Sequence, residues 1–314
     1  MTEAGGPVTG AAPGFVSGFV SILGRPNAGK STLLNALVGA KIAIVADKPQ
    51  TTRISIQGVL TLPEAQVVFL DTPGIHKADS AINRRMMDTV RAALDERDLL
   101  LYVADGTGAA AKRDRDAVSV LKHTETPVIL VVNKIDCLKQ KQDLLPLLDQ
   151  FRKLHPFADH IPISALTGEG LDTLRAAILK RLPPGPAYFP ADHITDQPER
   201  FLAAELIREK ILRLTHEEVP HSVAVIVEKW EETGNLIKIF ATIRVERPGQ
   251  KAIVIGAGGS VLKRVGTEAR LEMERFFGHK IYLDLHVKVQ PGWREKPMFL
   301  DALDWRTMAG SDDV

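Results

Sequence analysis

The sequence predicts two domains, a larger α/β domain with a mostly parallel sheet and, after it, a smaller α+β domain. Between residue 15 and about residue 182, short and strongly apolar runs alternate with longer amphipathic stretches. A proline-rich segment follows at 183–198, and residues 199–314 favour a helix, a hairpin, a second helix and a last strand. At 314 residues the chain is long enough to bury two cores of ordinary size.

Five runs rich in Val, Ile and Leu are expected to form strands of the first domain. They lie at residues 19–23, 54–62, 65–70, 99–104 and 127–132. Amphipathic patterns of helical period lie at residues 31–39, 83–97, 143–154 and 171–182. Runs this apolar are typical of strands that are covered on both faces. We therefore expect a mixed, mostly parallel sheet with helices on both of its faces.

The segment 183–198 is expected to be a semi-rigid linker, because five prolines in it cannot sustain a helix or a central strand. The elements expected after it are a helix at 201–214, a hairpin from 222–230 and 236–246, a helix at 261–277 and a strand at 280–289. Residues 1–14, rich in Gly, Ala and Pro, are expected to be a disordered tail.

Composition excludes several classes of protein. There are 40 Lys and Arg against 39 Asp and Glu, which excludes a wholly basic nucleic-acid-binding surface but not a local basic patch. No apolar run approaches the ~20 residues that a membrane-spanning helix needs, and residues 1–15 contain no basic residue typical of a secretory signal. Cys137 is the single cysteine, so we expect no disulfide, a buried thiol and a reducing cytoplasm.

Residues 24–31 (GRPNAGKS) fit the pattern G-x-x-x-x-G-K-[ST] and lie between an apolar run and a helical pattern. Backbone N–H groups of such a loop and the N-terminus of the following helix favour phosphate. Lys30 is expected to bridge the β- and γ-phosphates, and the Ser31 hydroxyl to bind Mg²⁺. The expected nucleotide contacts here are Gly24, Arg25, Pro26, Asn27, Ala28, Gly29, Lys30, Ser31 and Thr32. The alternative is an ordinary Gly-Pro turn before a helix.

A second motif, Asp71-Thr72-Pro73-Gly74, follows the apolar run 65–70. An aspartate there can hold Mg²⁺ through water, and the Gly74 amide can reach the γ-phosphate. The motif is weak alone, because it is also a plain turn, and it gains force from its spacing to the first motif. The expected nucleotide contacts are Asp71, Thr72, Pro73, Gly74 and Ile75.

A threonine between these two motifs is expected to close over the γ-phosphate and Mg²⁺ when GTP is bound. Thr51 and Thr52 are both candidates, and we favour Thr52. The alternative is that both are β-branched residues that begin a strand. The expected Mg²⁺ ligands are therefore Ser31, Thr52 and Asp71.

Asn133-Lys134-Ile135-Asp136 follows the run 127–132 and selects the base. The Asp136 carboxylate can accept from N1–H and the exocyclic amine of guanine, whereas adenine would leave this charge unpaired. A backbone N–H from Ser164, Ala165 or Leu166 is expected to reach guanine O6. The expected nucleotide contacts in this part of the chain are Asn133, Lys134, Asp136, Ser164, Ala165 and Leu166. Four motifs in this order predict a GTPase and not an ATPase.

One position departs from Ras-like enzymes, in which a glutamine after D-x-x-G orients the attacking water. Here that position is Ile75, which has no polar side-chain atom. Our hypothesis is that Asn27 helps to bind a monovalent cation, expected to be K⁺, which neutralises phosphate charge. The alternative is that Asn27 only stabilises its own turn. The residues expected to serve catalysis are Lys30, Asn27, Thr52 and Gly74.

In the second domain, Gly256-Ala257-Gly258-Gly259 lies between an apolar run and a long helical pattern. A G-x-x-G loop in this place is the element with which a KH domain clamps single-stranded RNA. Its two middle residues carry no charge, so phosphate contact would rely on backbone N–H groups and the cations that follow. The expected RNA contacts are Gly256, Ala257, Gly258, Gly259, Lys263 and Arg264.

Taken together, these motifs make the chain resemble the Era family of bacterial ribosome-assembly GTPases. The resemblance rests on residues 24–35, 48–53, 71–76, 133–136, 164–166, 194–225, 254–266 and 282–289. It implies an α/β P-loop GTPase domain at 15–182 and a smaller α+β type II KH domain at 199–314. It also implies GTP hydrolysis coupled to binding of 16S rRNA near its 3′ end, in maturation of the 30S ribosomal subunit.

The resemblance further implies a cytoplasmic protein with peripheral contact to the inner face of the cell membrane. Ile75 is shared with the family, so it does not indicate an inactive enzyme. Three rival functions stay open. They are a GTPase whose second domain binds protein, an RNA chaperone that uses GTP only for structure, and a GTPase of transfer-RNA modification.

Overall fold

The structure is a computed structural model that describes residues 14–48, 50–76, 79–107, 110–216 and 219–308. The expected disordered tail therefore lies almost wholly outside the described residues. By their contacts the residues form two compact units. Unit 1 comprises residues 1–43, 52–76 and 86–196, and unit 2 comprises residues 44–51, 77–85 and 197–314.

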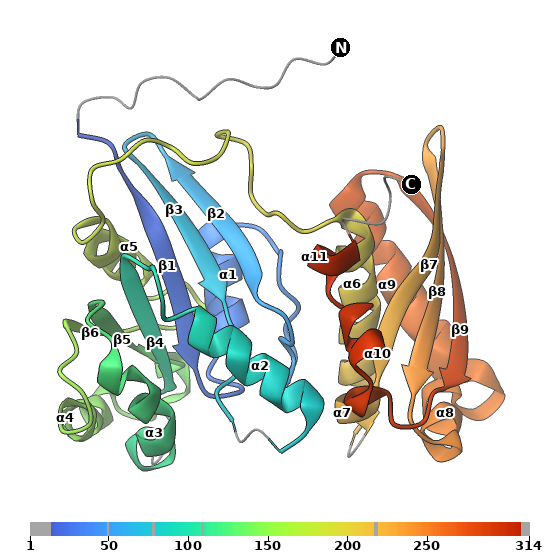
Figure 1. The fold of residues 1–314 in the computed structure, drawn as a ribbon, viewed down its shortest axis with the longest axis horizontal. Coiled ribbons are helices and arrows are strands. Elements are labelled where there is room, and N and C mark those ends of the chain that lie inside the picture. The colour runs from blue at the N-terminus through green and yellow to red at the C-terminus, as the bar shows by residue number, and fades with distance from the viewer. Residues whose placement is uncertain (1–13, 49, 77–78, 108–109, 217–218, 309–314) are drawn as a thin grey trace. The chain divides into compact units, whose positions relative to one another are not determined.

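Unit 1 contains a six-stranded sheet in the order β2-β3-β1-β4-β5-β6. Its strands are β1 (Val16–Gly24), β2 (Ile56–Leu62), β3 (Ala65–Asp71), β4 (Leu99–Asp105), β5 (Val128–Asn133) and β6 (Asp159–Pro162). β2 pairs antiparallel with β3, and the other neighbours are parallel. The mixed, mostly parallel sheet is thus confirmed, with the five apolar runs as β1 to β5 (Figure 1).

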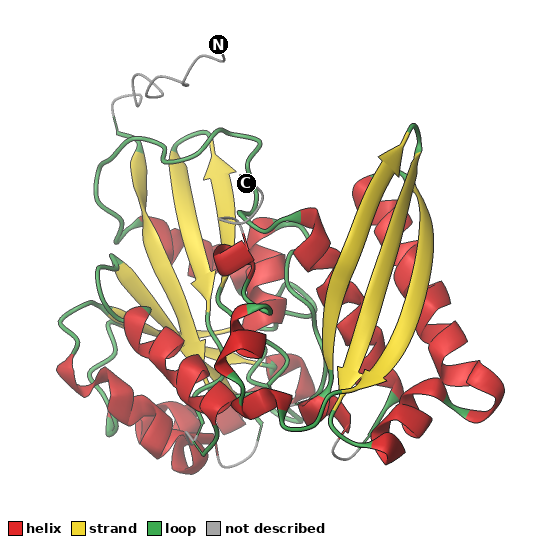
Figure 2. Ribbon diagram, turned by 45° about the vertical axis from the view of Figure 1, so that its right-hand side comes forward, coloured by secondary structure: helices red, strands yellow, loops and turns green. Residues whose placement is uncertain are grey.

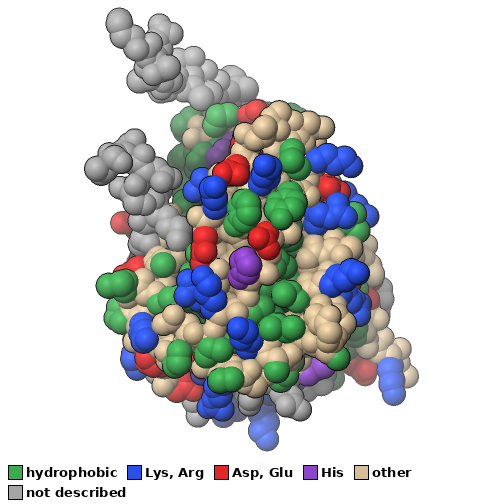
Figure 3. Space-filling model, turned by 90° about the vertical axis from the view of Figure 1, so that its right-hand side faces the viewer, with side chains coloured by type: hydrophobic (Ala, Val, Ile, Leu, Met, Phe, Trp, Pro, Cys, Tyr) green, Lys and Arg blue, Asp and Glu red, His purple; other side chains and the backbone are tan. Residues whose placement is uncertain are grey.

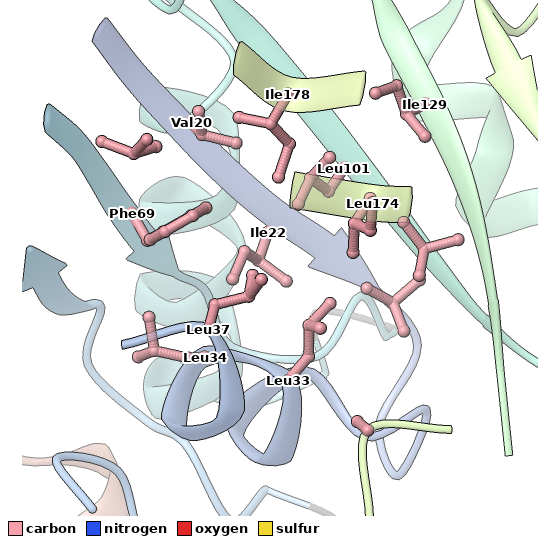
Figure 4. Close-up of a cluster of buried hydrophobic side chains, with 14 of the residues drawn as sticks. Val20, Ile22, Leu33, Leu34, Leu37, Phe69, Leu101, Ile129, Leu174 and Ile178 are labelled. Carbon is pink, nitrogen blue, oxygen red and sulfur yellow. The ribbon is translucent and has the colours of Figure 1, made fainter. Parts of the chain in front are cut away.

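Helices cover both faces of this sheet because its strands are apolar on both sides. They are α1 (Lys30–Val38), α2 (Ala81–Ala92), α3 (Ala110–Val118), α4 (Leu144–Arg152) and α5 (Leu171–Leu179). On one face, leucines of α1 and α5 pack against Val20, Ile22 and Phe69 (Figure 4). On the other face, side chains of α2, α3 and α4 pack against β4 and β5. The buried sheet holds the carboxyl ends of its parallel strands in fixed positions.

The proline-rich segment is attached to unit 1 along part of its length. Gln66 in β3, fully buried, accepts the N–H groups of Tyr188 and Phe189 at 2.6 and 2.9 Å. Further along, the Val59 N–H in β2 donates to the Ile194 carbonyl at 2.9 Å. Residues 183–196 therefore form a strap that crosses the ends of β1, β3 and β2 (Figure 1). Asp196 is the last residue of the strap, because Gln197 already belongs to unit 2.

Unit 2 has a three-stranded sheet with helices on one face (Figure 2). Its elements are α6 (Glu199–Leu214), α7 (Val219–Ser222), β7 (Ala224–Thr233), β8 (Leu236–Val245), α8 (Pro248–Ile255), α9 (Ser260–Phe277), β9 (Lys280–Val289), α10 (Pro297–Asp301) and α11 (Trp305–Met308). β7 and β8 form the expected antiparallel hairpin, and β9 pairs parallel to β8. This is the α+β domain that the sequence predicts.

The core of unit 2 lies between the sheet and helices α6 and α9. Its apolar part comes from alternate residues of the strands, such as Ile237, Ile239 and Ala241 on β8. Trp293 is fully buried and donates from its indole N–H to the Ser222 carbonyl at 3.1 Å, so this residue packs inside unit 2. α6 differs from a simple amphipathic helix, because three successive charged residues, Arg208, Glu209 and Lys210, are also buried.

Candidate functional site

The phosphate-binding loop connects β1 to α1 at the carboxyl edge of the sheet. Gly29 has φ +92°, and a Cβ there would overlap Asn133 Nδ2, so both the backbone angle and the space require glycine. A Cβ at Gly74 would lie 2.7 Å from Pro26 N, which shows how closely the D-x-x-G turn approaches the loop. The structure thus brings together the first two motifs that the sequence predicts.

Lys30 lies inside this loop. Its Nζ donates to the carbonyls of Gly24 at 3.2 Å and Arg25 at 3.1 Å, and the side chain is only 6% exposed. Burial lowers the pKa of the Lys30 ammonium, while the nearby carboxylates Asp71 and Asp114 raise it. A phosphate ligand would add negative charge beside this ammonium and favour its protonated form.

Three oxygen-bearing side chains meet next to Lys30. The Ser31 hydroxyl donates to Asp71 Oδ2 at 2.7 Å and lies 2.8 Å from the Thr52 hydroxyl. Thr52 Oγ1 in turn donates to Asp71 Oδ2 at 3.3 Å. The Thr51 hydroxyl instead donates to two carbonyls of its own loop, Lys48 at 2.6 Å and Ala46 at 3.2 Å. The geometry therefore brings Thr52, and not Thr51, to the other two expected Mg²⁺ ligands.

These residues fit a magnesium ion. Asp71 is fully buried, and its Oδ1 has no hydrogen-bond partner among the described residues. Burial raises the pKa of the Asp71 carboxyl, and Lys30 with the two hydroxyls opposes that shift. A cation at Oδ1 would relieve the cost of a buried carboxylate. Hydroxyl and carboxylate oxygens are the ligands that Mg²⁺ prefers, together with phosphates of a bound nucleotide.

Asn133 connects two loops of the site. Its Nδ2 donates to the Ala28 carbonyl at 2.9 Å, and its Oδ1 accepts the Ala165 N–H at 2.9 Å. The side chain is 2% exposed. Asn133 therefore braces the phosphate loop against the 164–166 loop.

Asp136 is the exposed carboxylate of the third motif. The Ser164 hydroxyl, the largest contribution, lowers the pKa of this carboxyl, so it is ionised at neutral pH. Leu166, 78% exposed, follows at the end of the 164–166 loop. Cys137 is exposed beside Asp136, with its Sγ 3.3 Å from Oδ2, so the prediction of a buried thiol was wrong. The chain turns through a short 3-10 helix here and leaves the residue on the surface.

A supporting contact of this motif was missed by sequence reasoning. Lys134 has φ +67°, and its Nζ pairs with Asp105 Oδ2 at 2.8 Å. Asp105 ends β4, whose partner strand β5 ends at Asn133. The sequence does place an aspartate at the carboxyl end of the run 99–104. The ion pair with Lys134 could be predicted from it only if β4 and β5 were known to be neighbours in the sheet.

Other expected nucleotide contacts lie with their side chains turned to the protein interior. Ile75 is buried in the apolar cluster that contains Leu23 and Val90, and its N–H donates to the Gly24 carbonyl at 3.0 Å. The Thr72 hydroxyl donates to the Ile22 carbonyl at 2.8 Å. Both residues hold the turn of the second motif through these contacts. Asn27, in contrast, is exposed at the tip of the phosphate loop with φ +62°.

The G-x-x-G loop joins α8 to α9. Gly256 has φ +74°, and a Cβ there would lie 2.9 Å from Val261 N, so glycine is required at this position. Gly258 and Gly259 also have positive φ, and Gly259 precedes the first turn of α9. Lys263 is exposed on α9, whereas the exposed Arg264 pairs with Glu268 at 2.7 Å. Within the loop the Gly256 N–H donates to the Ala252 carbonyl at 2.8 Å and the Gly259 N–H to the Gly256 carbonyl at 3.1 Å. Among the described residues, Lys263 is the nearer of the two cations and has no helix-internal ion pair.

The surface around this loop is mixed in character. In Figure 3, which views the side where α8, α9 and β9 lie, basic side chains are spread among acidic and hydrophobic ones. Exposed apolar residues of these elements include Ile253, Leu271 and Tyr282. Single-stranded RNA offers both phosphates and unstacked bases, and such a mixture of basic and apolar groups suits it.

No helix among the described residues is long and apolar enough to span a bilayer.

Comparisons with known proteins match both predicted domains. The family model for 50S ribosome-binding GTPases matches residues 19–134, and that for KH domains matches residues 218–294. The chain is 51% identical over 288 residues to GTPase Era of Syntrophus aciditrophicus, and the match covers 91% of this chain and 94% of the relative. The chain belongs to the Era family of GTPases. Era of Heliobacterium modesticaldum is 50% identical over 283 residues, with 90% and 94% covered.

Two crystal structures of Era share the fold along nearly the whole chain. One is a variant of Aquifex aeolicus Era bound to GDP·AlF4⁻, at 42% identity and a TM-score of 0.88. The other is Era with MgGDPNP and nucleotides 1506–1542 of 16S ribosomal RNA, at 41% identity and a TM-score of 0.88. Each match covers 93% of this chain and 99% of the solved chain. A P-loop GTPase domain followed by a KH domain, the predicted fold class, is thereby confirmed.

Proposed function

We propose that this Era-family GTPase is a molecular switch that binds 16S rRNA near its 3′ end and acts in maturation of the 30S subunit. The observation that carries the proposal is the meeting of Ser31, Thr52 and Asp71 beside Lys30, with Asp71 Oδ1 left buried and without a hydrogen-bond partner among the described residues. Such a site suits Mg²⁺ and a nucleoside triphosphate. The RNA part rests on the G-x-x-G loop and on a relative crystallised with MgGDPNP and a 16S fragment.

In this proposal the phosphate loop, residues 24–31, holds the triphosphate through its backbone N–H groups. The Lys30 ammonium exchanges its bonds to the loop carbonyls for bonds to phosphate oxygens. Ser31, Thr52 and Asp71 hold Mg²⁺, which neutralises phosphate charge when it is bound. The Gly74 amide, in a turn that lies close to Pro26 of this loop, is proposed to donate to the γ-phosphate.

Guanine is recognised by Asp136, whose ionised carboxylate accepts from N1–H and the exocyclic amine. Ser164 keeps this carboxylate in place by donating its hydroxyl. Asn133 acts indirectly, since it fixes the loop that carries Ser164 relative to the phosphate loop. Discrimination against adenine then follows from the unpaired charge that adenine would leave.

The attacking water must be oriented without the side chain of Ile75, which is buried away from the site. We propose that Asn27 supports a K⁺ ion at the exposed tip of the phosphate loop. Its amide oxygen is a suitable ligand for a monovalent cation, which would add positive charge next to the phosphates. Asn27 and Lys30, with Thr52 and Gly74, are thus the residues proposed to serve catalysis.

The deciding experiment is GTP turnover by the purified chain in potassium and in sodium buffer. Each buffer is tested with and without a single-stranded RNA that carries the 3′ end of 16S rRNA, and a shuffled RNA serves as control. Turnover that needs potassium, and rises only with the cognate RNA, supports the cation site and the switch. Turnover indifferent to both would refute these two parts and favour a chaperone that keeps GTP for structure.

Binding measurements separate a switch from a constitutive RNA binder and from a GTPase that binds only protein. RNA affinity that differs between GDPNP, GDP and no nucleotide supports a switch, and equal affinities would contradict it. A second domain that binds only protein would bind none of these RNAs. Peripheral contact with the inner face of the cell membrane, in an otherwise cytoplasmic protein, stays a prediction from the family resemblance.

A further inference from the structure

The turn at residues 105–107, which follows β4, contacts the third nucleotide-binding motif at two points, and both belong to unit 1. At the backbone, the Gly106 N–H donates to the Asn133 carbonyl at 2.7 Å. A Cβ at Gly106 would lie 2.8 Å from that carbonyl oxygen, so the close approach requires glycine. Through the side chains, Asp105 Oδ2 accepts from Lys134 Nζ at 2.8 Å. The turn therefore holds the two successive residues with which the motif begins.

The Asp105 carboxylate is itself fixed by its surroundings. Its Oδ1 accepts the Thr107 N–H at 2.9 Å and the Thr107 hydroxyl at 2.6 Å. Arg113 on α3 in turn donates to the Thr107 carbonyl at 2.7 Å. Burial raises the pKa of the Asp105 carboxyl, but the hydrogen bonds from Lys134 and Thr107 outweigh burial and hold the pKa below its ordinary value. The carboxylate is therefore ionised at neutral pH and keeps one oxygen on Lys134.

Lys134 has an unusual backbone conformation, with φ +67° and ψ +35°. Such angles are uncommon for a residue other than glycine and persist where the surrounding structure holds them. Lys134 directly precedes the short helix Ile135–Cys137, which carries Asp136. From the other side, the Ile135 N–H donates to the Ile163 carbonyl at 3.2 Å. The direction of this short helix, and with it the position of the Asp136 carboxylate, therefore depends on the conformation of Lys134.

Stability alone is a weak reason for this ion pair. The side chains of Lys134 and Asp105 are 35% and 28% exposed, and ion pairs that water reaches contribute little to the free energy of unfolding. The pair instead acts on a residue in a disfavoured backbone conformation, two positions before the carboxylate that is proposed to bind guanine. That placement indicates a role in positioning.

We propose that Asp105 is a positioning residue for recognition of the guanine base. Its carboxylate holds Lys134 in the left-handed conformation, so that the helix that follows presents Asp136 to the base and need not be ordered when the nucleotide binds. The inference rests on the proposed role of Asp136. Because Asp136 accepts from both N1–H and the exocyclic amine of guanine, its displacement weakens binding of GDP more than binding of inosine diphosphate (IDP), whose base lacks the amine.

The test compares affinities for GDP and IDP, in Mg²⁺, for four full-length proteins with one substitution each and for the unchanged chain. Asp105→Asn keeps the shape of the side chain but removes the charge that pairs with Lys134, and Asp105→Glu restores that charge on a longer side chain. Asp172→Asn is the matched control, because Asp172 also forms an ion pair of 2.8 Å, with Arg175 in α5. Asp136→Ala tests the underlying role of that carboxylate. Hydrogen exchange of the β5 peptide, measured alongside without nucleotide, reports the stability of unit 1.

The unchanged chain should prefer GDP to IDP by roughly 10-fold or more, the effect of one hydrogen bond to a charged group. For Asp105→Asn we expect this preference to fall roughly 5-fold while β5 exchange stays unchanged, since most of that one hydrogen bond is lost and the pair adds little stability. Asp105→Glu should recover part of the preference, and Asp172→Asn should keep all of it.

An equal loss of affinity for GDP and IDP in Asp105→Asn would mean a structural role and overturn the inference. So would an unchanged preference in Asp105→Asn beside a reduced one in Asp136→Ala, which leaves the proposed function standing. An unchanged preference in Asp136→Ala would overturn the guanine-binding role of Asp136 and the inference with it.

Discussion

Replacing Asn133 tests whether one side chain holds the two loops of the nucleotide site together. Asn133→Ala removes a donor to the Ala28 carbonyl and an acceptor for the Ala165 N–H, both at 2.9 Å in a buried place. Each partner left buried and unsatisfied costs about 1–3 kcal/mol, so unit 1 should lose about 2–6 kcal/mol of its free energy of unfolding. Affinity for GDP should fall as well, because the loop it stabilises carries the phosphate contacts.

Hydrogen exchange of the β5 peptide in the nucleotide-free protein measures this loss directly. A loss of about 2 kcal/mol corresponds to roughly 30-fold faster exchange of β5 amides that open only on unfolding of the unit. The three tryptophans, Trp230, Trp293 and Trp305, all lie in unit 2, so their fluorescence in urea serves as an internal control and should not change. Asn235→Ala, in the exposed turn between β7 and β8, is the matched surface substitution.

Asn133→Asp separates the two hydrogen bonds. It keeps an acceptor for the Ala165 N–H but places a carboxylate oxygen against the Ala28 carbonyl. We expect it to be at least as destabilising as Asn133→Ala, because a buried charge faces an acceptor. Exchange of β5 within about threefold of the unchanged protein in either variant would refute the assignment of Asn133 as a brace.

Three further predictions address the base, the RNA and the metal. Asp136→Asn should lower GTP affinity by more than ~100-fold. It should favour xanthosine triphosphate, because the 2-oxo group of xanthine accepts a hydrogen bond from the asparagine amide. Competition binding measures the affinities for the two nucleotides. Gly256→Asp should abolish binding of the 16S fragment in a filter assay, since φ is +74° and a Cβ would meet Val261, while Gly249→Asp adds the same charge in open space and should bind as before. Burial raises the pKa of the Asp71 carboxyl above its ordinary value of 3.8, so the stability that this carboxyl contributes without nucleotide falls as pH rises from that value through the raised pKa. Asp71→Asn should therefore be more stable than the unchanged protein at neutral pH in EDTA but not at low pH, by thermal unfolding, and should lose Mg²⁺-dependent GDPNP binding.

Most of the fold could be predicted because its strands are unusually apolar. A run as apolar as 127–132 is typical of a strand that is covered on both faces, and β5 forms there. No element was expected at 110–118, where charged residues fill the middle of α3, because its pattern has a weak apolar face. On α6 the same rule failed in another way. The helical pattern predicted the helix, but it gave no sign that Arg208, Glu209 and Lys210 are buried by contacts that only the tertiary fold supplies.

The candidate site, like the fold, could be predicted only in part. Motif spacing alone identified the residues that meet around Lys30, since a loop, a strand end and a helix start fix their positions. Motif spacing could not predict which residues of these motifs direct their side chains toward the nucleotide. Asn133 and Ile75 belong to nucleotide-binding motifs, yet one braces two loops and the other packs in the core. The choice between Thr51 and Thr52 likewise depended on which hydroxyl the loop uses for its own turn.

The strap at residues 183–196 has a consequence for behaviour at high protein concentration. β2 is an edge strand, and an uncovered edge offers unpaired N–H and carbonyl groups to strands of other molecules. Here the Val59 N–H binds the Ile194 carbonyl, and the Thr195 hydroxyl binds the Gln57 carbonyl at 2.8 Å. The strap also contains Pro190, and a proline has no N–H with which to extend a ladder. The strap that follows the last helix of unit 1 thereby protects the exposed edge of β2 from pairing with strands of other molecules.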